Sequence, residues 1–178
     1  MGKEIERKFL IKDVEKLHYI LKINNALVKS IKQGYISFDP QVRVRVVDCK
    51  DHRYNYITTK AYLTIKSKGL LERNEFEYKV PVKDAEELLK TAKGKIIEKT
   101  RYTFPHNKLY WEVDWFKTGA KPAEFSDLTG DLPPEDTGFW MAEIELPSAE
   151  HEIELPDWLG KEVTFDPRYQ NINMAQNG

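Results

Sequence analysis

Charged residues of one sign recur two positions apart in several segments of the chain. Four acidic pairs and two basic pairs have this spacing. They are Glu4/Glu6, Glu75/Glu77, Glu112/Asp114 and Glu143/Glu145, and Arg43/Arg45 and Lys99/Arg101. Residues two apart on a β-strand point to the same face of the sheet, so each pair marks one face of one strand. Lys8 and Lys66 add single basic residues to the pattern.

These residue types suit the binding of a polyanion together with a metal ion. Mg²⁺ and Mn²⁺ prefer carboxylate oxygens, and Mg²⁺ usually combines a few carboxylates with phosphate oxygens. Arginine contacts phosphate through paired hydrogen bonds and lysine through a point charge. Like charges side by side are unfavourable unless an opposite charge binds them. A polyphosphate that arrives with its own divalent ion would satisfy both kinds of pair. The competing interpretation is a sheet with one charged face in water.

Alternation of apolar and charged residues predicts the strands that position these pairs. The same segments are enriched in β-branched and aromatic residues. We expect eight strands, at Lys3–Ile11, Val28–Phe38, Gln41–Val47, Tyr62–Ser67, Arg73–Val82, Ile96–Phe104, Lys108–Phe116 and Phe139–Leu146, with a turn at Asp39-Pro40.

Only short helices interrupt this pattern. Val14–Ile23 follows a capping residue, Asp13, and carries apolar residues at helical spacing. Ala85–Ala92 follows Asp84 and is expected to end before Gly94. Two more short helices are expected, at Ser148–Glu152 and from Arg168 towards Ala175.

The predicted fold class is α+β, mainly β, with an eight-stranded antiparallel barrel closed on itself. The charged faces would point inward, and the few helices would cover the apolar outer faces. An eight-stranded barrel has an interior just large enough for side chains or one small ligand.

Two segments lack this alternation. Residues 117–138 form a long, Pro- and Gly-containing loop insertion with five acids and two lysines. An acidic loop near an entrance would repel polyanions, and this composition offers little to bury, so we expect the loop to lie away from the entrance or to be mobile. Residues 48–58 are predicted as a shorter excursion between two strands.

Composition limits the class of protein. A chain of 178 residues is expected to form one domain, spanning residues 1–178. The single cysteine, Cys49, excludes a disulfide framework and a Cys-rich zinc site and favours a cytoplasmic location. No apolar run spans a membrane, and the first residues lack the apolar core of a signal peptide. Lys and Arg number 28 against 29 Asp and Glu, which argues against nucleic-acid binding.

A series of short motifs resembles the CYTH superfamily, the triphosphate tunnel metalloenzymes. Glu4–Lys8 resembles the ExExK signature of that superfamily. The other motifs follow in the family's order at Gln33–Tyr35, Arg43–Arg45, Thr64–Lys66, Arg73–Glu77, Glu98–Tyr102, Glu112–Asp114, Ala142–Glu145, Trp158–Thr164 and Arg168–Asn171. Their combination carries the resemblance, and the sequence departs from the family pattern mainly at 117–138 and 48–58.

The resemblance implies a tunnel in which a triphosphate lies beside Mg²⁺ or Mn²⁺. It implies that the catalytic ion is held by Glu4, Glu6, Glu143 and Glu145. A second ion, or ordered waters and lysines, would be held by Glu75, Glu77, Glu112 and Asp114. Contacts with the triphosphate are assigned to Lys8, Arg43, Arg45, Lys66, Arg73, Lys99 and Arg101.

Tyr35 corresponds to a proton-accepting tyrosine in bacterial relatives. A phenol with a pKa near 10 needs cationic neighbours to act as a base at neutral pH. Lys8 and Lys66 are grouped with it as catalytic candidates. Lys161 and Arg168 are further candidates from the C-terminal segment, which could close one end of the tunnel.

The resemblance favours a Mg²⁺- or Mn²⁺-dependent hydrolase of inorganic triphosphate, acting as a monomer or homodimer without nucleic-acid or membrane partners. Three alternatives remain open: an adenylyl cyclase or a thiamine or nucleoside triphosphatase on the same fold, a non-catalytic polyphosphate- or nucleotide-binding module, and a solvated β domain. The presence of all four acidic pairs favours catalysis, because a binding module would need only the basic ones.

Overall fold

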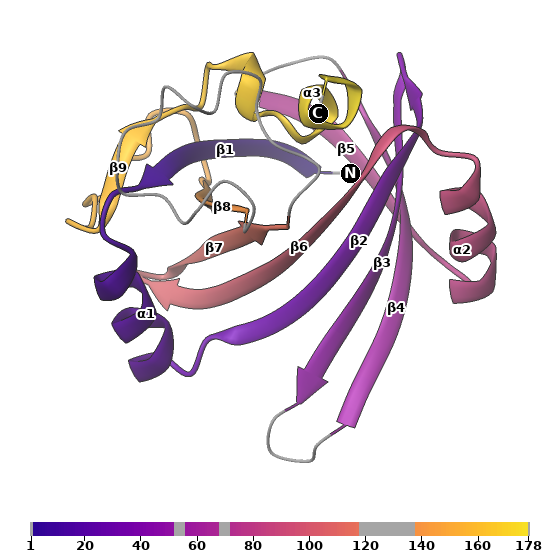
Figure 1. Ribbon diagram of the computed structural model, residues 1–178. Helices are drawn as coiled ribbons and strands as arrows, with labels where there is room; N and C mark the ends of the chain where they lie inside the picture. The colour runs from indigo at the N-terminus through magenta and orange to yellow at the C-terminus, as the bar shows by residue number, and fades with distance from the viewer. Residues whose placement is uncertain (1, 52–55, 68–71, 118–137, 178) are drawn as a thin grey trace.

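The chain folds into one large sheet with three α-helices among the residues that the structure describes. The computed structural model describes residues 2–51, 56–67, 72–117 and 138–177, and only the backbone at residues 2–4, 51, 72 and 73 (Figure 1). The elements in chain order are β1 (Gly2–Ile11), α1 (Val14–Ile23), β2 (Leu27–Phe38), β3 (Gln41–Asp51), β4 (Tyr56–Lys66), β5 (Glu72–Val80), α2 (Val82–Lys90), β6 (Lys93–His106), β7 (Leu109–Phe116), β8 (Phe139–Glu145), β9 (Leu159–Glu162), a short 3₁₀ turn η2 (Pro167–Tyr169) and α3 (Asn171–Asn177).

The strands pair antiparallel in the order β5-β4-β3-β2-β6-β7-β8-β1-β9. The start of β1 also pairs with β5, where Gly2–Ile5 lie opposite Glu72–Glu75, and the rest of β1 pairs with β8. The prediction of a mainly-β antiparallel fold with short helices is therefore confirmed. The prediction of eight strands was wrong by one, because β9 adds to the end of β1.

The hairpin of β3 and β4 is longer than the sequence predicted. Residues 48–51 and 56–61 are strands, although a loop was expected over 48–58. Alternation is weak there because side chains on both faces are largely exposed, including Tyr56 and Ile57, so apolar and polar residues do not alternate. Pairing across the hairpin stabilises them instead: Asp48 and Thr59 are directly opposite, and the Thr59 hydroxyl donates to the Asp48 carboxylate over 2.6 Å. Residues 52–55 lie outside the described residues, as do residues 118–137 of the predicted acidic loop.

Two of the predicted helices form close to their expected places. In α1 the Asp13 carboxylate accepts a hydrogen bond from the Lys16 amide over 2.8 Å, which satisfies one of the free N–H groups of the first turn. The C-terminal helix appears as η2 followed by α3.

The other two helix predictions need correction. The helix α2 begins at Val82, after Pro81, and ends at Lys90. Asp84 therefore lies inside the first turn, where its charge favours the helix dipole, and makes no cap. The expected helix at 148–152 is a turn in which the His151 amide donates to the Ser148 carbonyl over 3.2 Å.

Two clusters of apolar side chains pack on the outer faces of the strands. Leu17 of α1 is buried with Trp111 and Trp158 in the largest cluster, and Ala85 and Leu89 of α2 cover Val44 and Ala61 on β3 and β4. Since neighbouring strand residues alternate between faces, the charged pairs lie on the opposite, inner face.

A third cluster lies on the inner face, at the ends of β6–β8. Phe116 is two positions from Asp114, and Phe139 is four from Glu143, so they share the face of the charged pairs. The two rings stack 4.6 Å apart at 7°, and α3 and η2 pack against this cluster.

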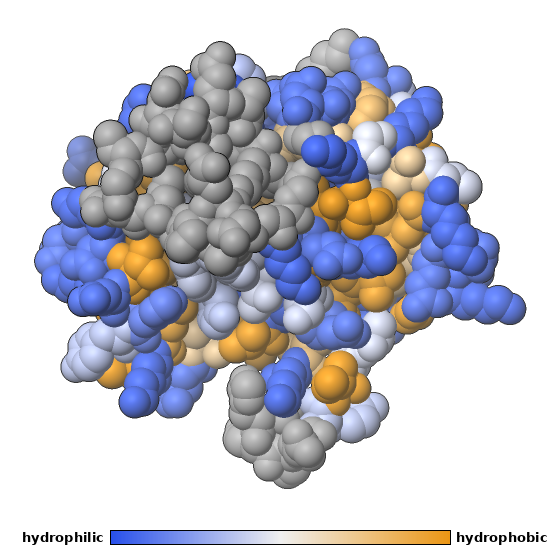
Figure 2. Space-filling view, in the orientation of Figure 1, coloured by the Kyte–Doolittle hydropathy of each residue, from blue (hydrophilic) through white to orange (hydrophobic). Residues whose placement is uncertain are grey.

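The visible surface is mostly hydrophilic over the described residues, with smaller hydrophobic areas between (Figure 2). Among the exposed apolar side chains, Tyr19 and Ile23 lie one turn apart on α1, and Phe165 lies far from them in the sequence. Within the described ranges, the longest helices fall well short of the length and apolar content needed to cross a membrane.

Candidate functional site

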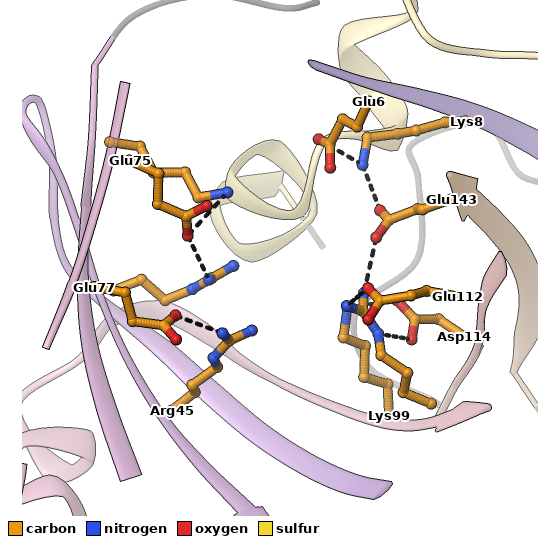
Figure 3. Close-up of polar contacts among 12 residues, drawn as sticks. Glu6, Lys8, Arg45, Glu75, Glu77, Lys99, Glu112, Asp114 and Glu143 are labelled. Carbon is orange, nitrogen blue, oxygen red and sulfur yellow. Dashed lines mark hydrogen bonds and ion pairs between the residues drawn. The ribbon is translucent and has the colours of Figure 1, made fainter. Parts of the chain in front are cut away.

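A cavity of about 1000 Å³ lies against the inner face of the sheet. Charged side chains of both signs dominate its lining. The basic ones are Arg43, Arg45, Lys66, Lys99, Lys108 and Arg101, and the acidic ones are Glu6, Glu75, Glu77, Glu112, Glu143 and Glu145. Figure 3 shows the charged groups in two sets that face each other across an open space. One set comes from β1 and β6–β8, and the other from β3–β5. The structure thus brings most of the residues predicted from sequence into one place.

Lys8 lies in the first set between two carboxylates. Its ammonium contacts Glu143, which is directly opposite on β8, and lies 3.0 Å from an oxygen of Glu6. Burial would lower the pKa of Lys8, but the charges of Glu143 and Glu6 and their hydrogen bonds outweigh it and raise that pKa. Only 1% of Lys8 is exposed, and it does not line the cavity. Lys8 therefore holds its two neighbours in place from behind the cavity wall.

Arg101 joins three carboxylates in the same set. Its Nε and Nη2 donate to the two oxygens of Asp114 at 2.7 Å each, a bidentate pair. Nη2 also donates to Glu143 over 2.8 Å, and Nη1 contacts Glu112. Register explains this arrangement, because Arg101 lies opposite Asp114 on β7, and Glu112 lies opposite Glu143 on β8.

Lys99 completes the first set from β6. Its ammonium donates to Asp114 over 2.5 Å. Burial, together with the charge of Arg101, lowers the pKa of Lys99 from its ordinary value to about 8, and Asp114 only partly offsets this. Burial would raise the pKa values of Asp114 and Glu143, but the surrounding cations outweigh it and lower both. Lys99 is thus a buried amine that can release its proton near neutral pH, beside carboxylates that stay ionised.

The second set spans the neighbouring strands β3, β4 and β5. Arg45 contacts Glu77 over 2.5 Å, and the Thr64 hydroxyl donates to the same carboxylate over 3.2 Å. Glu75 lies more loosely between Lys66, at 3.5 Å, and Arg43, at 3.8 Å. Burial and the charge of Arg43 lower the pKa of Arg45. The cations of this wall are close together and only partly neutralised, as a site for an anion requires.

Four predicted residues differ from the expected placement or are described only in part. Asp114 is fully buried and, like Lys8, lies behind the lining. Glu4 and Arg73 are opposite each other where β1 pairs with β5, and their side chains lie outside the described part of the chain. Tyr35 does line the cavity, with its ring packed 5.7 Å from that of Phe38.

The predicted role of Lys161 and Arg168 at one end of the site is not supported by their positions. Neither lines the cavity, and Arg168 pairs with Asp166 over 2.7 Å. The neighbouring residues 170–172 line it instead.

Other lining residues were not predicted. They include Gln41, Thr103, Lys108 and Tyr110. The spacing of two could have identified Thr103 and Tyr110, because they continue the inner faces that carry Lys99/Arg101 and Glu112/Asp114. The same spacing could have identified Gln41, which precedes Arg43/Arg45 by two, and Lys108, which precedes Tyr110 by two.

The donor chemistry of one part of the site fits a hard divalent cation. Glu6 and Glu145 are directly opposite on β1 and β8, and both line the cavity together with Glu143. Carboxylate oxygens are the ligands that Mg²⁺ and Mn²⁺ prefer. As the described side chains lie, no three acidic, histidine or cysteine residues are grouped closely enough to hold an ion.

Comparison with known proteins agrees with this mainly-β architecture. The CYTH domain model matches residues 2–172, so the chain belongs to the CYTH domain family. An inorganic triphosphatase of Acetivibrio thermocellus is 38% identical, with 99% of this chain and 96% of the relative covered. An inorganic triphosphatase of Nitrosomonas europaea is 31% identical, with 97% and 96% covered.

Solved structures show the same fold. The crystal structure of an inorganic triphosphatase superposes with a TM-score of 0.55 at 27% identity and covers 98% of this chain and 95% of its own. A putative adenylate cyclase from Bacillus halodurans superposes with a TM-score of 0.50 at 15% identity, with 85% of each chain covered. The second likeness concerns the fold alone.

Proposed function

We propose that this chain hydrolyses inorganic triphosphate with the help of Mg²⁺ or Mn²⁺. One observation supports this above the others: basic side chains line two facing walls of one cavity, and carboxylates hold them in place. A linear polyanion has the shape and the charge to lie between those walls. Both relatives named above are inorganic triphosphatases.

In this proposal the cavity is the interior of a tunnel. The pairing of β1 with β5 joins the two ends of the eight-strand run from β5 to β1, which supports closure of the sheet into a barrel. Residues 170–172 line one part of the cavity and lie at the start of α3. A closed interior would exclude bulk water, and this strengthens every charge interaction inside it.

Binding would exchange internal ion pairs for contacts with phosphate. Arg43, Arg45 and Lys66 would contact phosphate oxygens from one side, and Lys99 and Arg101 from the other. Glu75 lies 3.5 Å from Lys66 and 3.8 Å from Arg43, whereas Glu77 lies 2.5 Å from Arg45. The contacts of Glu75 are therefore weaker, and a phosphate oxygen would replace them more easily. Arg101 would keep its bidentate contact with Asp114, which fixes its orientation.

Glu6, Glu143 and Glu145, with Glu4, would hold the divalent ion beside the phosphates. When bound, such an ion neutralises charge on phosphoryl oxygens and activates water. Lys8 would orient Glu6 and Glu143, and its charge lowers the pKa of Glu143 and so keeps that carboxylate ionised. The catalytic contribution of the chain is then positioning and charge stabilisation, which is what phosphoryl transfer chiefly requires.

Lys99 and Tyr35 are the groups proposed to hold or transfer protons during the reaction. A lysine with a pKa of about 8 carries both protonated and neutral forms near neutral pH. Its Nζ can therefore hold a proton or accept one. Tyr35 lines the same cavity and remains the proposed second proton-accepting group.

The test is an assay of the pure protein with Mg²⁺ or Mn²⁺ and a panel of tripolyphosphate, ATP, GTP and thiamine triphosphate. Phosphate, pyrophosphate and cyclic AMP are measured separately. We expect release of phosphate, fastest from tripolyphosphate. Formation of cyclic AMP and pyrophosphate from ATP would identify a cyclase instead. Binding of tripolyphosphate without turnover under any metal would identify a binding module.

A further inference from the structure

Gln33 of β2 is a buried polar residue for which the described part of the chain supplies no partner. It has 0% of its surface exposed, and neither its carboxamide oxygen nor its nitrogen makes a hydrogen bond to any described residue. A buried donor or acceptor without a partner destabilises the folded state. The side chain is therefore expected to gain a partner in the working protein.

The neighbours of Gln33 narrow the choice of partner. Its two cross-strand neighbours are Ile97 on β6, which has no polar side-chain atom, and Arg45 on β3. The Nε of Arg45 is itself buried and without a partner among the described residues. Directly opposed residues of antiparallel strands have Cβ atoms about 4.5–5.5 Å apart. The oxygen of Gln33 and the Nε of Arg45 are each three bonds from their Cβ, so the two side chains can run together and meet.

The guanidinium of Arg45 has one hydrogen-bonded partner among the described residues and also lies over the ring of Tyr62, 5.6 Å from its centre. Nη2 contacts Glu77 over 2.5 Å, and Nε has no described partner. Figure 3 shows Glu77 and Arg45 side by side on the wall of the cavity. If a phosphate oxygen takes the place of Glu77, the guanidinium loses that contact with the wall. A hydrogen bond at Nε, together with the ring of Tyr62, would keep the plane of the guanidinium fixed.

We propose that Gln33 is a positioning residue for substrate binding: its carboxamide oxygen accepts a hydrogen bond from Nε of Arg45 when a polyphosphate engages the terminal nitrogens of that arginine. This inference rests on the function proposed above. Gln33 does not line the cavity, so it acts through Arg45 and has no direct contact with the substrate.

The primary test uses Gln33→Met, which keeps the volume and removes the polar atoms. Melting temperature is measured with and without tripolyphosphate, in the absence of divalent ions so that no turnover occurs, and KM and kcat are measured with Mg²⁺. Without ligand we expect an equal or higher melting temperature, because two unpartnered polar atoms are gone. We expect affinity for tripolyphosphate to fall about tenfold, since a hydrogen bond to a charged group is lost. KM should rise more than kcat falls.

Two controls separate positioning from packing. Ile97→Met changes the other neighbour of Gln33 without removing a polar group, and it should leave the affinity for tripolyphosphate unchanged. In an Arg45→Lys background, which keeps the charge but has no Nε, Gln33→Met should have no further effect on affinity. Gln33→Leu serves as a second apolar replacement if the methionine variant does not fold.

The outcomes are distinct. Unchanged affinity in Gln33→Met, or an equal loss of affinity with and without Arg45→Lys, overturns the inference and leaves the proposed function standing. A parent protein that neither binds nor hydrolyses tripolyphosphate overturns both. The inference is supported if Gln33→Met has an equal or higher melting temperature and binds tripolyphosphate more weakly, and if this loss of affinity occurs only when residue 45 is arginine.

Discussion

Lys99 donates to Asp114 over 2.5 Å, and both side chains are almost completely removed from solvent. The contact nevertheless leaves the two groups unequal. The pKa of Lys99 falls to about 8, chiefly through burial and the charge of Arg101, whereas the cations around Asp114 lower the pKa of that carboxyl. Asp114 therefore stays ionised wherever Lys99 changes its charge, and the proton that exchanges near neutral pH belongs to the lysine.

The pH dependence of folding should reveal this unequal pair. The pKa of Lys99 is near 10.5 when unfolded and about 8 when folded. Between those values the unfolded chain binds more protons, so the contribution of Lys99 to the free energy of unfolding rises with pH. We expect the parent to gain stability relative to Lys99→Met as pH increases from about 8 to about 10.5. Denaturant unfolding at several pH values measures this, and parallel stability curves would contradict the assignment.

Asp114→Asn should destabilise the fold strongly. Removing one partner of a buried ion pair leaves Lys99 and Arg101 uncompensated, which typically costs about 3–5 kcal/mol. The folded-state pKa of Asp114 is lowered, so its contribution is present above the unfolded pKa near 3.8 and is lost as pH falls below that value. Chemical denaturation at pH 7 and at pH 3 tests both statements.

Asp157→Asn is the matched control for that experiment. Asp157 pairs with Lys16 on the surface, and a solvent-exposed pair contributes little. Equal losses in the free energy of unfolding of the two variants would mean that the buried contacts of Asp114 stabilise the fold no more than a surface ion pair does.

Glu145→Gln should reduce turnover by about a hundredfold or more, the scale seen when preorganised charge is removed from a transition state. The fold should survive, and the concentration of Mg²⁺ needed for half-maximal activity should increase. Activity is measured across a Mg²⁺ titration. Glu162→Gln is the control, because Glu162 pairs with Arg7 and does not line the cavity. Full activity of a Glu6→Gln, Glu145→Gln double variant would refute the proposed metal site.

Arg43→Ala should weaken the binding of tripolyphosphate. The stabilisation that a ligand gives depends on its affinity for the native state, so the rise in melting temperature with tripolyphosphate should shrink. Lys32→Ala removes a basic residue of β2 that pairs with Glu98 and does not line the cavity, and it should behave as the parent. An undiminished rise in Arg43→Ala would favour a charged face that simply contacts water.

The sequence predicted the faces of the strands better than the contacts between them. Alternation placed Arg101, Glu112 and Asp114 on the inner side because a spacing of two is a property of each strand alone. That Arg101 would bind both acids and also Glu143 depends on the register of β6, β7 and β8, and on Glu143 arriving from beyond the segment 117–138. The sequence of a single strand therefore does not predict the contact between Arg101 and Glu143.

The same limit explains the residues behind the cavity wall. The resemblance implied that Lys8 contacts the triphosphate and that Asp114 holds a second ion or ordered waters and lysines, and both share a face with residues that line the cavity. Each is instead covered by its partners, Lys8 by Glu6 and Glu143, and Asp114 by Lys99 and Arg101. The four-residue β9 was missed because so short a segment carries too little alternation to be recognised.

The stacked rings of Phe116 and Phe139 mark a position where the chain could accept an inserted domain or new termini. They are directly opposite on β7 and β8, and Gly138 adopts a φ of +107° beside them, where an added Cβ would lie 1.9 Å from the Phe116 carbonyl oxygen. The two ends of the connection are thereby held by the sheet itself. By loop-closure entropy, each doubling of the number of residues between two fixed ends costs only about 0.6 kcal/mol. This junction is therefore a natural place to insert a reporter domain or to open new termini while leaving the charged interior in place.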